Sequence, residues 1–296
     1  ERIRFSAVIL FSTLWIIVVY APSTHWIWGG GLLSDLGWAS ESLNGYATMD
    51  FAGGLVVHAN AAVAALIIAK FLGSRKGFPN DLHPPHNPGL VMIGAAMLWV
   101  GWFGFNAGSA LAANGTAGMA LTVTHISAAT ACLVWTLIEY LRFGKPSLVG
   151  IATGAIAGLA TITPGSGFVG PAGAIVYGAL AAIVCFYMIS VVKNVWNIDD
   201  SLDVFAVHGV GGILGILLTA FFADKSLGGV GLPEGVTMGT AFLGQLIATI
   251  VTIVWASIAA FVLLKVTKSL VGLRVSEEDE DEGLDITSHG ERSYDI

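Results

Sequence analysis

Two histidines lie inside apolar, small-residue-rich stretches of this sequence. His58 is in DFAGGLVVHANAAVAAL (50–66) and His208 is in DSLDVFAVHGVGGILGILL (200–218). An imidazole exchanges a proton near neutral pH, so a histidine in hydrocarbon is a candidate functional residue. Two facing imidazoles can share one proton, and in an apolar channel desolvation favours the uncharged pair. Such a pair offers a donor and an acceptor to a small polar molecule.

The two stretches form an internal repeat. Aligning His208 with His58 places Asp200 over Asp50, each eight residues before its histidine, and matches the small residues that follow. An aspartate at a helix start usually caps free backbone N–H groups, which is the simpler interpretation of both carboxylates. Asp50 can also favour an arriving cation, and the two roles are compatible. We expect the nearby Asp203 to be structural.

A metal centre is the competing interpretation of the histidine pair. It needs a third ligand and usually an open position. The sequence has no H-E-x-x-H motif, and no cysteine or acidic residue follows either histidine within one helical turn. Cys132 and Cys185 lie in apolar runs, where we expect small buried side chains rather than ligands or a disulfide. The sequence therefore predicts no metal site, and we expect neither a cofactor nor an enzymatic activity.

The elements that carry these residues are predicted to be membrane helices. The 296-residue chain is 55% hydrophobic and only 11% charged, whereas a soluble domain has about 25% charged residues. Apolar runs of about 20 residues recur, long enough to cross roughly 30 Å of hydrocarbon. We predict an all-α polytopic membrane protein with eight spanning helices: 4–22, 51–71, 89–111, 117–141, 147–163, 168–192, 203–222 and 238–265.

Basic residues predict how these helices are oriented. Twelve of the 13 Lys and Arg residues fall at one set of helix ends, and Lys225 falls at the other. By the positive-inside rule, the basic set and both visible chain ends are cytoplasmic. Helices 51–71 and 203–222 then run in opposite directions. The repeat is therefore inverted and places His58 and His208 at similar depth near the membrane midplane.

The repeat also predicts what precedes the visible chain. The second unit contains five helices, from 89–111 to 203–222, whereas only two helices make up the visible part of the first unit. If the repeat is a complete 5+5, three further helices are expected before Glu1.

Aromatic residues near the outer helix ends have two interpretations. The run GWFGFNAGSA (101–110) ends one helix and places Phe105 and Ser109 one turn apart on a shared face. The opposite outer loop holds Trp26 and Trp28 in HWIWGGG. Interfacial tryptophans usually anchor the bilayer surface. An indole face together with a serine hydroxyl can instead bind an ammonium-like cation.

The remaining polar features are His125, the 35–49 loop and the tail. His125 has no repeat partner, so we expect a core histidine satisfied by its neighbours. The loop 35–49 (DLGWASESLNGYATM) has no assigned role. Nine of the 20 acidic residues lie in the last 24 residues. The tail SEEDEDEGLDITSHGERSYDI (276–296) is either a solvated, mobile segment or one held against its neighbours or a regulator.

Several long motifs occur along the chain in a fixed order: DFAGGLVVHANAA, GWFGFNAGSA, DVFAVHGVGGILG, SLGGVGLPEGVTMG and GLRVSEEDEDEGLD followed by SHGERSY. Together they resemble the ammonium transporter family (Amt/MEP/Rh), on its bacterial Amt side, over residues 1–296. The resemblance implies eleven transmembrane helices, a 5+5 inverted repeat plus a final helix, and a homotrimer with one pore per subunit. The eight visible helices match the fourth to eleventh, with the first three missing.

The resemblance also implies roles for individual residues. His58 and His208 resemble the twin-histidine pair of the hydrophobic pore, and Trp102 resembles a tryptophan of the conducting path. Phe105 resembles one ring of the phenylalanine gate. The outer recruitment site is matched by a set of three residues: Trp28, Ser109 and Asp50. The second gate phenylalanine and another recruitment aromatic belong to the helices expected before Glu1.

The function that we expect is membrane transport of ammonium or ammonia. The ion would be captured at the outer mouth and deprotonated, and ammonia would pass the histidine pair. An ammonium sensor of the same family is the alternative, and an intramembrane metalloenzyme is a third class. Expected partners are the lipid bilayer and a PII-type regulatory protein on the cytoplasmic face, with no nucleic acid. We expect residues 1–272 to form the pore domain in the inner (cytoplasmic) membrane and 273–296 to form a cytoplasmic tail.

Overall fold

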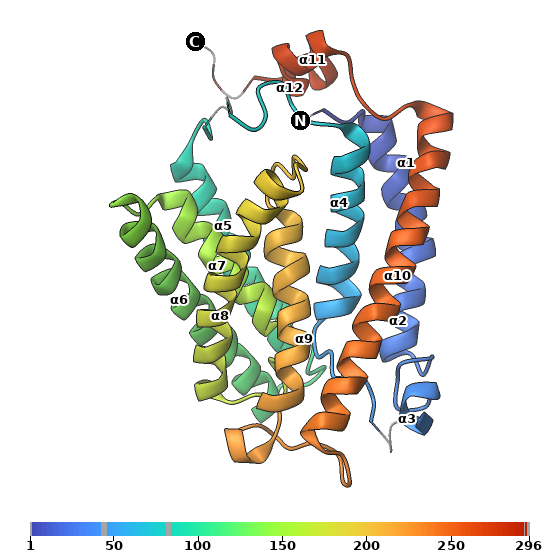
Figure 1. Cartoon of the computed structure of the whole chain (residues 1–296), viewed down its shortest axis with the longest axis vertical. Coiled ribbons are helices and arrows are strands. Elements are labelled where there is room, and N and C mark those ends of the chain that lie inside the picture. Colours follow the sequence, from blue (N-terminus) through green and yellow to red (C-terminus); the bar gives the residue numbers. More distant parts are fainter. Residues whose placement is uncertain (1, 43–45, 81–83, 293, 295–296) are drawn as a thin grey trace.

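The computed structural model describes residues 2–42, 46–80, 84–292 and 294, and this part of the chain is almost entirely helical (Figure 1). The α-helices are α1 (Phe5–Trp15), α2 (Ala21–Trp28), α3 (Trp38–Ser42), α4 (Asn60–Leu72), α5 (Pro88–Gly108), α6 (Gly115–Phe143), α7 (Leu148–Ile162), α8 (Pro171–Ser190), α9 (Val210–Phe222), α10 (Met238–Val271), α11 (Glu277–Glu282) and α12 (Leu284–His289). Wider π-helical segments adjoin several of them: Ile16–Tyr20, Gly54–Ala59, Val191–Val195 and Phe205–Gly209.

Seven helical segments of the described chain are long and apolar enough to cross a membrane, as the sequence predicted for seven of its eight helices. They are Phe5–Trp28, Gly54–Leu72, Pro88–Gly108, Gly115–Phe143, Pro171–Val195, Phe205–Phe222 and Met238–Val271. The eighth predicted helix, 147–163, forms as α7 with only 15 residues. That length rises about 22 Å, which is less than the hydrocarbon thickness.

The first helix is longer than the predicted 4–22. It continues through the π-helical segment Ile16–Tyr20 and past Pro22 to Trp28. A proline normally interrupts a helix because its nitrogen has no hydrogen to donate. Here Pro22 falls just after the wide turns, in the first turn of α2, where the missing bond is tolerated. Trp26 and Trp28 therefore lie on the last helical turn, and the prediction that they lie in a loop was wrong.

The predicted inverted repeat is confirmed by two antiparallel helices. α4 and α9 run in opposite directions, and each contacts the π-helical segment that precedes the other (Figure 1). Each is preceded by a π-helical segment, Gly54–Ala59 or Phe205–Gly209, and each segment contains the repeat histidine. In both copies the matching aspartate accepts backbone N–H groups at the helix start. The symmetry extends from the sequence to backbone geometry.

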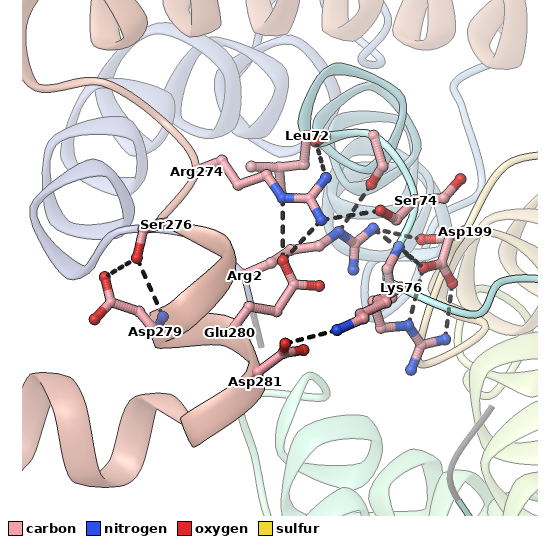
Figure 2. A network of polar contacts seen from close by, with 12 residues as sticks. Arg2, Leu72, Ser74, Lys76, Asp199, Arg274, Ser276, Asp279, Glu280 and Asp281 are labelled. Carbon is pink, nitrogen blue, oxygen red and sulfur yellow. Dashed lines mark hydrogen bonds and ion pairs between the residues drawn. The ribbon is translucent and has the colours of Figure 1, made fainter. Parts of the chain in front are cut away.

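The acidic tail is held against the basic end of the bundle, which favours the second of its two interpretations (Figure 2). The Arg274 guanidinium donates to the carbonyl oxygens of Leu72 and Ser74 and to the Glu280 carboxylate at 2.7–3.1 Å. Lys76 forms an ion pair with Asp281 at 2.7 Å. α12 is also in contact with the body, because His289 packs edge-on against Phe5. Residues 293, 295 and 296 of the predicted tail, and 43–45 of the 35–49 loop, lie outside the described residues.

Asp199 joins three segments beneath this tail. Arg75 binds both of its carboxylate oxygens, at 2.7 and 2.9 Å, and Arg2 donates to its backbone carbonyl at 2.8 Å. Asp199 is only 2% exposed. Burial alone would raise the pKa of its carboxyl group, but hydrogen bonds from Arg75 and the charges of Arg75 and Arg2 hold that pKa below its ordinary value.

We predict that Asp199→Asn lowers the free energy of unfolding by about 3 kcal/mol, because it removes a buried carboxylate charge that Arg75 binds through both oxygens. Thermal unfolding of the protein in detergent measures this loss. Asp281→Asn is the matched control: it breaks an exposed pair of the same network and should leave the midpoint nearly unchanged. Equal midpoints for both variants would contradict the role assigned to Asp199.

The same carboxylate predicts a pH dependence. Since the pKa of Asp199 is depressed in the folded state, its stabilisation is present above the unfolded pKa of about 3.9 and is lost as pH falls through the folded value. The stability difference between the natural protein and Asp199→Asn should therefore shrink on acidification below about pH 4.

Candidate functional site

The two repeat histidines are in direct contact, as predicted. Their Nδ1 atoms lie 3.2 Å apart, and the ring centroids are separated by 5.2 Å at a tilt of 34°. One ring donates and the other accepts, so the pair shares a single proton between these nitrogens. His58 is buried and His208 is half-buried. The Nε2 atom of His58 is buried without a hydrogen-bond partner, so it is available to a small polar molecule.

A π-turn sets the direction of the His58 side chain. The backbone N–H of His58 donates to the carbonyl of Gly53, five residues back, at 2.9 Å. Gly53 has a φ of 115°, in a region that favours glycine because a Cβ would be strained there. The turn leaves backbone N–H groups without partners in the helix. Its stability therefore depends on preceding residues that can accept these hydrogen bonds.

Asp50 satisfies those groups. Its two carboxyl oxygens accept four backbone hydrogen bonds from residues 53–56, at 2.6–3.1 Å. Asp50 is 3% exposed, and its own carbonyl accepts the indole N–H of Trp28 at 2.6 Å. The capping interpretation is confirmed. Because both oxygens face backbone donors, Asp50 acts on the site by fixing the helix that carries His58.

Aromatic rings form one wall beside the histidines. The ring of Trp102 lies nearly parallel to His58 at 5.2 Å and to His208 at 6.3 Å, and Phe105 meets His58 edge-on at 6.0 Å. The indole N–H of Trp102 donates to the Thr163 hydroxyl at 2.9 Å, and both residues are buried. No feature of the sequence marked Thr163, because its role depends on a contact between helices that are far apart in the chain.

The outer candidates are connected only in part, because the Trp28 indole N–H is bonded to the Asp50 carbonyl. Trp28 is 43% exposed at the end of α2. Ser109 follows α5 rather than lying within it, since that helix ends at Gly108, and its hydroxyl donates to the Phe105 carbonyl at 2.9 Å. Among the described residues no hydrogen bond joins Trp28 to Ser109. The structure therefore brings together the predicted pore residues but leaves the outer pair as separate groups.

Two other polar residues have structural surroundings. His125 is exposed on α6 and packs against the rings of Trp99 and Phe103, so the prediction of a core histidine was wrong. Asp203 forms an ion pair with Lys193 at 2.6 Å, in agreement with its expected structural role. Within the described residues, no group of three or more His, Cys, Asp or Glu side chains is placed to hold a metal ion.

Comparison with known proteins assigns the fold. Residues 1–294 match the model of the Ammonium Transporter Family. The chain belongs to this family. It is 46% identical over 297 residues to an ammonium transporter of Aquifex aeolicus, covering 100% of this chain and 66% of that protein. It is also 46% identical over 297 residues to the ammonium transporter Amt1 of Archaeoglobus fulgidus, covering 99% and 72%.

Solved structures of the same family agree in fold. The structure titled "Sensor Amt Protein" superposes with a TM-score of 0.87 at 29% identity, covering 97% of this chain and 71% of that one. Mep2 of Saccharomyces cerevisiae gives a TM-score of 0.79 at 31% identity, covering 94% and 63%. The present chain thus spans about two thirds of the length of the relatives that it matches.

We predict that Asp50→Asn destabilises the protein by about 2–4 kcal/mol. The amide keeps one acceptor oxygen and turns an NH2 group toward backbone donors, so buried N–H groups lose their partner. Thermal unfolding in detergent is the measurement. Asp224→Asn is the matched control, because Asp224 caps a short exposed turn through the Ser226 backbone N–H. A loss no larger than that of the control would contradict the role of Asp50.

Proposed function

We propose that this chain forms a pore that transports ammonium or ammonia across a membrane. The observation that carries the proposal is the contact of His58 and His208 inside an apolar bundle, 3.2 Å apart and stacked against Trp102. Membership of the ammonium transporter family supports the substrate. The relatives are named as ammonium transporters, which supports a transport protein rather than an enzyme.

The first step is capture at the outer mouth. The exposed ring of Trp28 offers a π-face to a cation, and the hydroxyl of Ser109 offers an oxygen to an ammonium N–H. Each group has its own backbone partner, since the Trp28 indole donates to the Asp50 carbonyl and the Ser109 hydroxyl donates to the Phe105 carbonyl. Asp50 supports this mouth through its carbonyl, which holds the Trp28 indole in place.

The second step is loss of a proton near Phe105 and Asp50, and the proton passes to water at the outer mouth. A bare cation in a dry, apolar passage is strongly disfavoured, whereas neutral ammonia is not. Phe105 and Trp102 lie edge to face, with their ring centroids 5.7 Å apart. Neither side chain carries a charge that could stabilise a cation beside the histidines. Ammonia then passes the imidazole pair, which gives and accepts one hydrogen bond and so replaces water around a small polar molecule.

The family resemblance extends the proposal to the protein's setting. The bundle is a multi-pass protein of the inner (cytoplasmic) membrane, with its basic end and C-terminal tail on the cytoplasmic side. It forms a homotrimer, and a PII-type regulatory protein docks at the cytoplasmic face. The tail that is folded against Arg274 and Lys76 supports a regulated surface at this end.

We predict that replacing both histidines, His58→Ala with His208→Ala, reduces the discrimination between ammonium and potassium by about tenfold or more, since the pair no longer replaces water. Ion currents and flux in proteoliposomes measure it. His125→Ala is the control, because that exposed imidazole lies on α6 outside the pair. Unchanged, selective transport by the double variant would overturn the pore assignment. Ammonium binding without flux in the natural protein would indicate the sensor alternative.

A further inference from the structure

The continuous helical segment Phe205–Phe222, which includes α9, carries glycines that approach two different neighbours. A Cβ placed on Gly212 would lie 2.7 Å from the carbonyl oxygen of Gly54 and 2.9 Å from the Cβ of His58. A Cβ on Gly209 would lie 2.9 Å from the Cβ of Ala62. Gly211 instead faces α7, where the nearest atom is the hydroxyl oxygen of Thr161 at 2.8 Å. Gly209 and Gly212 thus form one seam with the helix of His58.

The atoms opposite Gly212 cannot move aside. One is a backbone oxygen in the π-turn that Asp50 holds in place, and the other is the Cβ of His58 itself. Neither is the far end of a flexible side chain. Any side chain at position 212 must therefore push α9 away from the Gly54–Ala59 segment, because packed interiors do not absorb such an overlap.

That displacement acts directly on the histidine pair. Gly212 follows His208 by four residues, about one helical turn, so a shift of the chain at Gly212 also shifts the His208 ring. The Nδ1–Nδ1 distance is already 3.2 Å, at the long end of the hydrogen-bond range. A further separation of about 0.5 Å or more would break the contact. Each ring would then bind water by itself, and the passage would admit hydrated ions.

The inverted repeat places a small residue at the corresponding position of the other helix. Ala62 follows His58 by four residues, and its methyl group fits against the bare Gly209. The seam therefore has two close contacts: Gly212 lies against His58, and Ala62 lies against Gly209. Both contacts depend on the absence of a side chain at Gly209 and Gly212.

We propose that Gly212, with Gly209, is a positioning residue that sets the separation of His58 and His208 and thereby the ion selectivity of the pore. The selectivity part of this inference rests on the proposed transport function, whereas the separation of the rings does not. The two parts are therefore tested by separate measurements.

The first experiment measures the contact itself in Gly212→Ala. Solid-state NMR of protein with 15N-labelled histidine, in lipid bilayers, detects the coupling across an N–H···N hydrogen bond. We expect the coupling in the natural protein and its loss in Gly212→Ala. Gly211→Ala is the matched control, because the Thr161 hydroxyl can rotate away, and it should keep the coupling. A coupling that survives in Gly212→Ala overturns the proposal, whatever the transport results are.

The second experiment measures selectivity in proteoliposomes. Gly212→Ala should lose roughly two- to tenfold of its discrimination between ammonium and potassium, the factor expected for one lost hydrogen bond, while Gly211→Ala keeps it. In the His58→Ala and His208→Ala background, Gly212→Ala should have no additional effect. Loss of coupling with unchanged selectivity overturns the selectivity part of the proposal alone.

A rescue pair keeps the inference testable if Gly212→Ala does not fold. A Cβ on Gly209 would lie 2.9 Å from the Cβ of Ala62 and 3.1 Å from Cδ2 of the Phe205 ring, so Ala62→Gly removes the tighter of the two contacts. We expect Gly209→Ala to weaken the coupling and the discrimination, and the combined variant with Ala62→Gly to restore both. Failure of the second substitution to restore either quantity would overturn the role of this seam.

Discussion

A backbone N–H group buried in an apolar bundle must find an acceptor, and the site depends on how two helix starts meet this requirement. The π-turn before α4 leaves four N–H groups free, and the two carboxyl oxygens of Asp50 accept all of them. Asp200 serves the corresponding turn through the backbone N–H of Phe205 at 2.7 Å. With both turns fixed, the two imidazoles have defined directions, and the aromatic wall of Trp102 and Phe105 has a fixed surface to pack against.

At the basic end of the bundle, backbone carbonyl oxygens also find hydrogen-bond partners, and here the donors are charged guanidinium groups. Arg2 and Arg274 bind carbonyl oxygens in the segment after α4 as well as acidic side chains. The start of the chain, this segment, Asp199 and the tail are therefore one connected surface (Figure 2). Asp199 is the neighbour of Asp200, so the ion pairs under the tail and the cap of the His208 helix belong to adjacent residues.

Local patterns explain why much of this was predictable. Apolar runs predict the helices, because the backbone can cross hydrocarbon only when its N–H and C=O groups are hydrogen-bonded to one another. The Asp–His spacing occurs twice, in helices of opposite direction. It therefore identified the histidine pair and predicted that both rings lie at a similar depth in the membrane. The errors occurred where tertiary contacts outweigh local signals. The π-helical segment before Pro22 lets the helix continue to Trp28, which therefore lies at a helix end rather than in the predicted loop. His125 lies on an exposed face of its helix, although its apolar neighbours in the sequence suggested burial.

The sequence by itself determined the membrane helices, the inverted repeat, the pairing of His58 with His208 and the family, because periodicity, charge bias and motif order are carried by the chain. Only the tertiary structure decided that the Asp50 carbonyl holds Trp28, that Thr163 holds Trp102 and that Gly212 contacts Gly54. These contacts join residues from different helices. Their distances follow from how closely the helices pack, and packing is set by all the side chains of an interface together rather than by any one stretch of sequence.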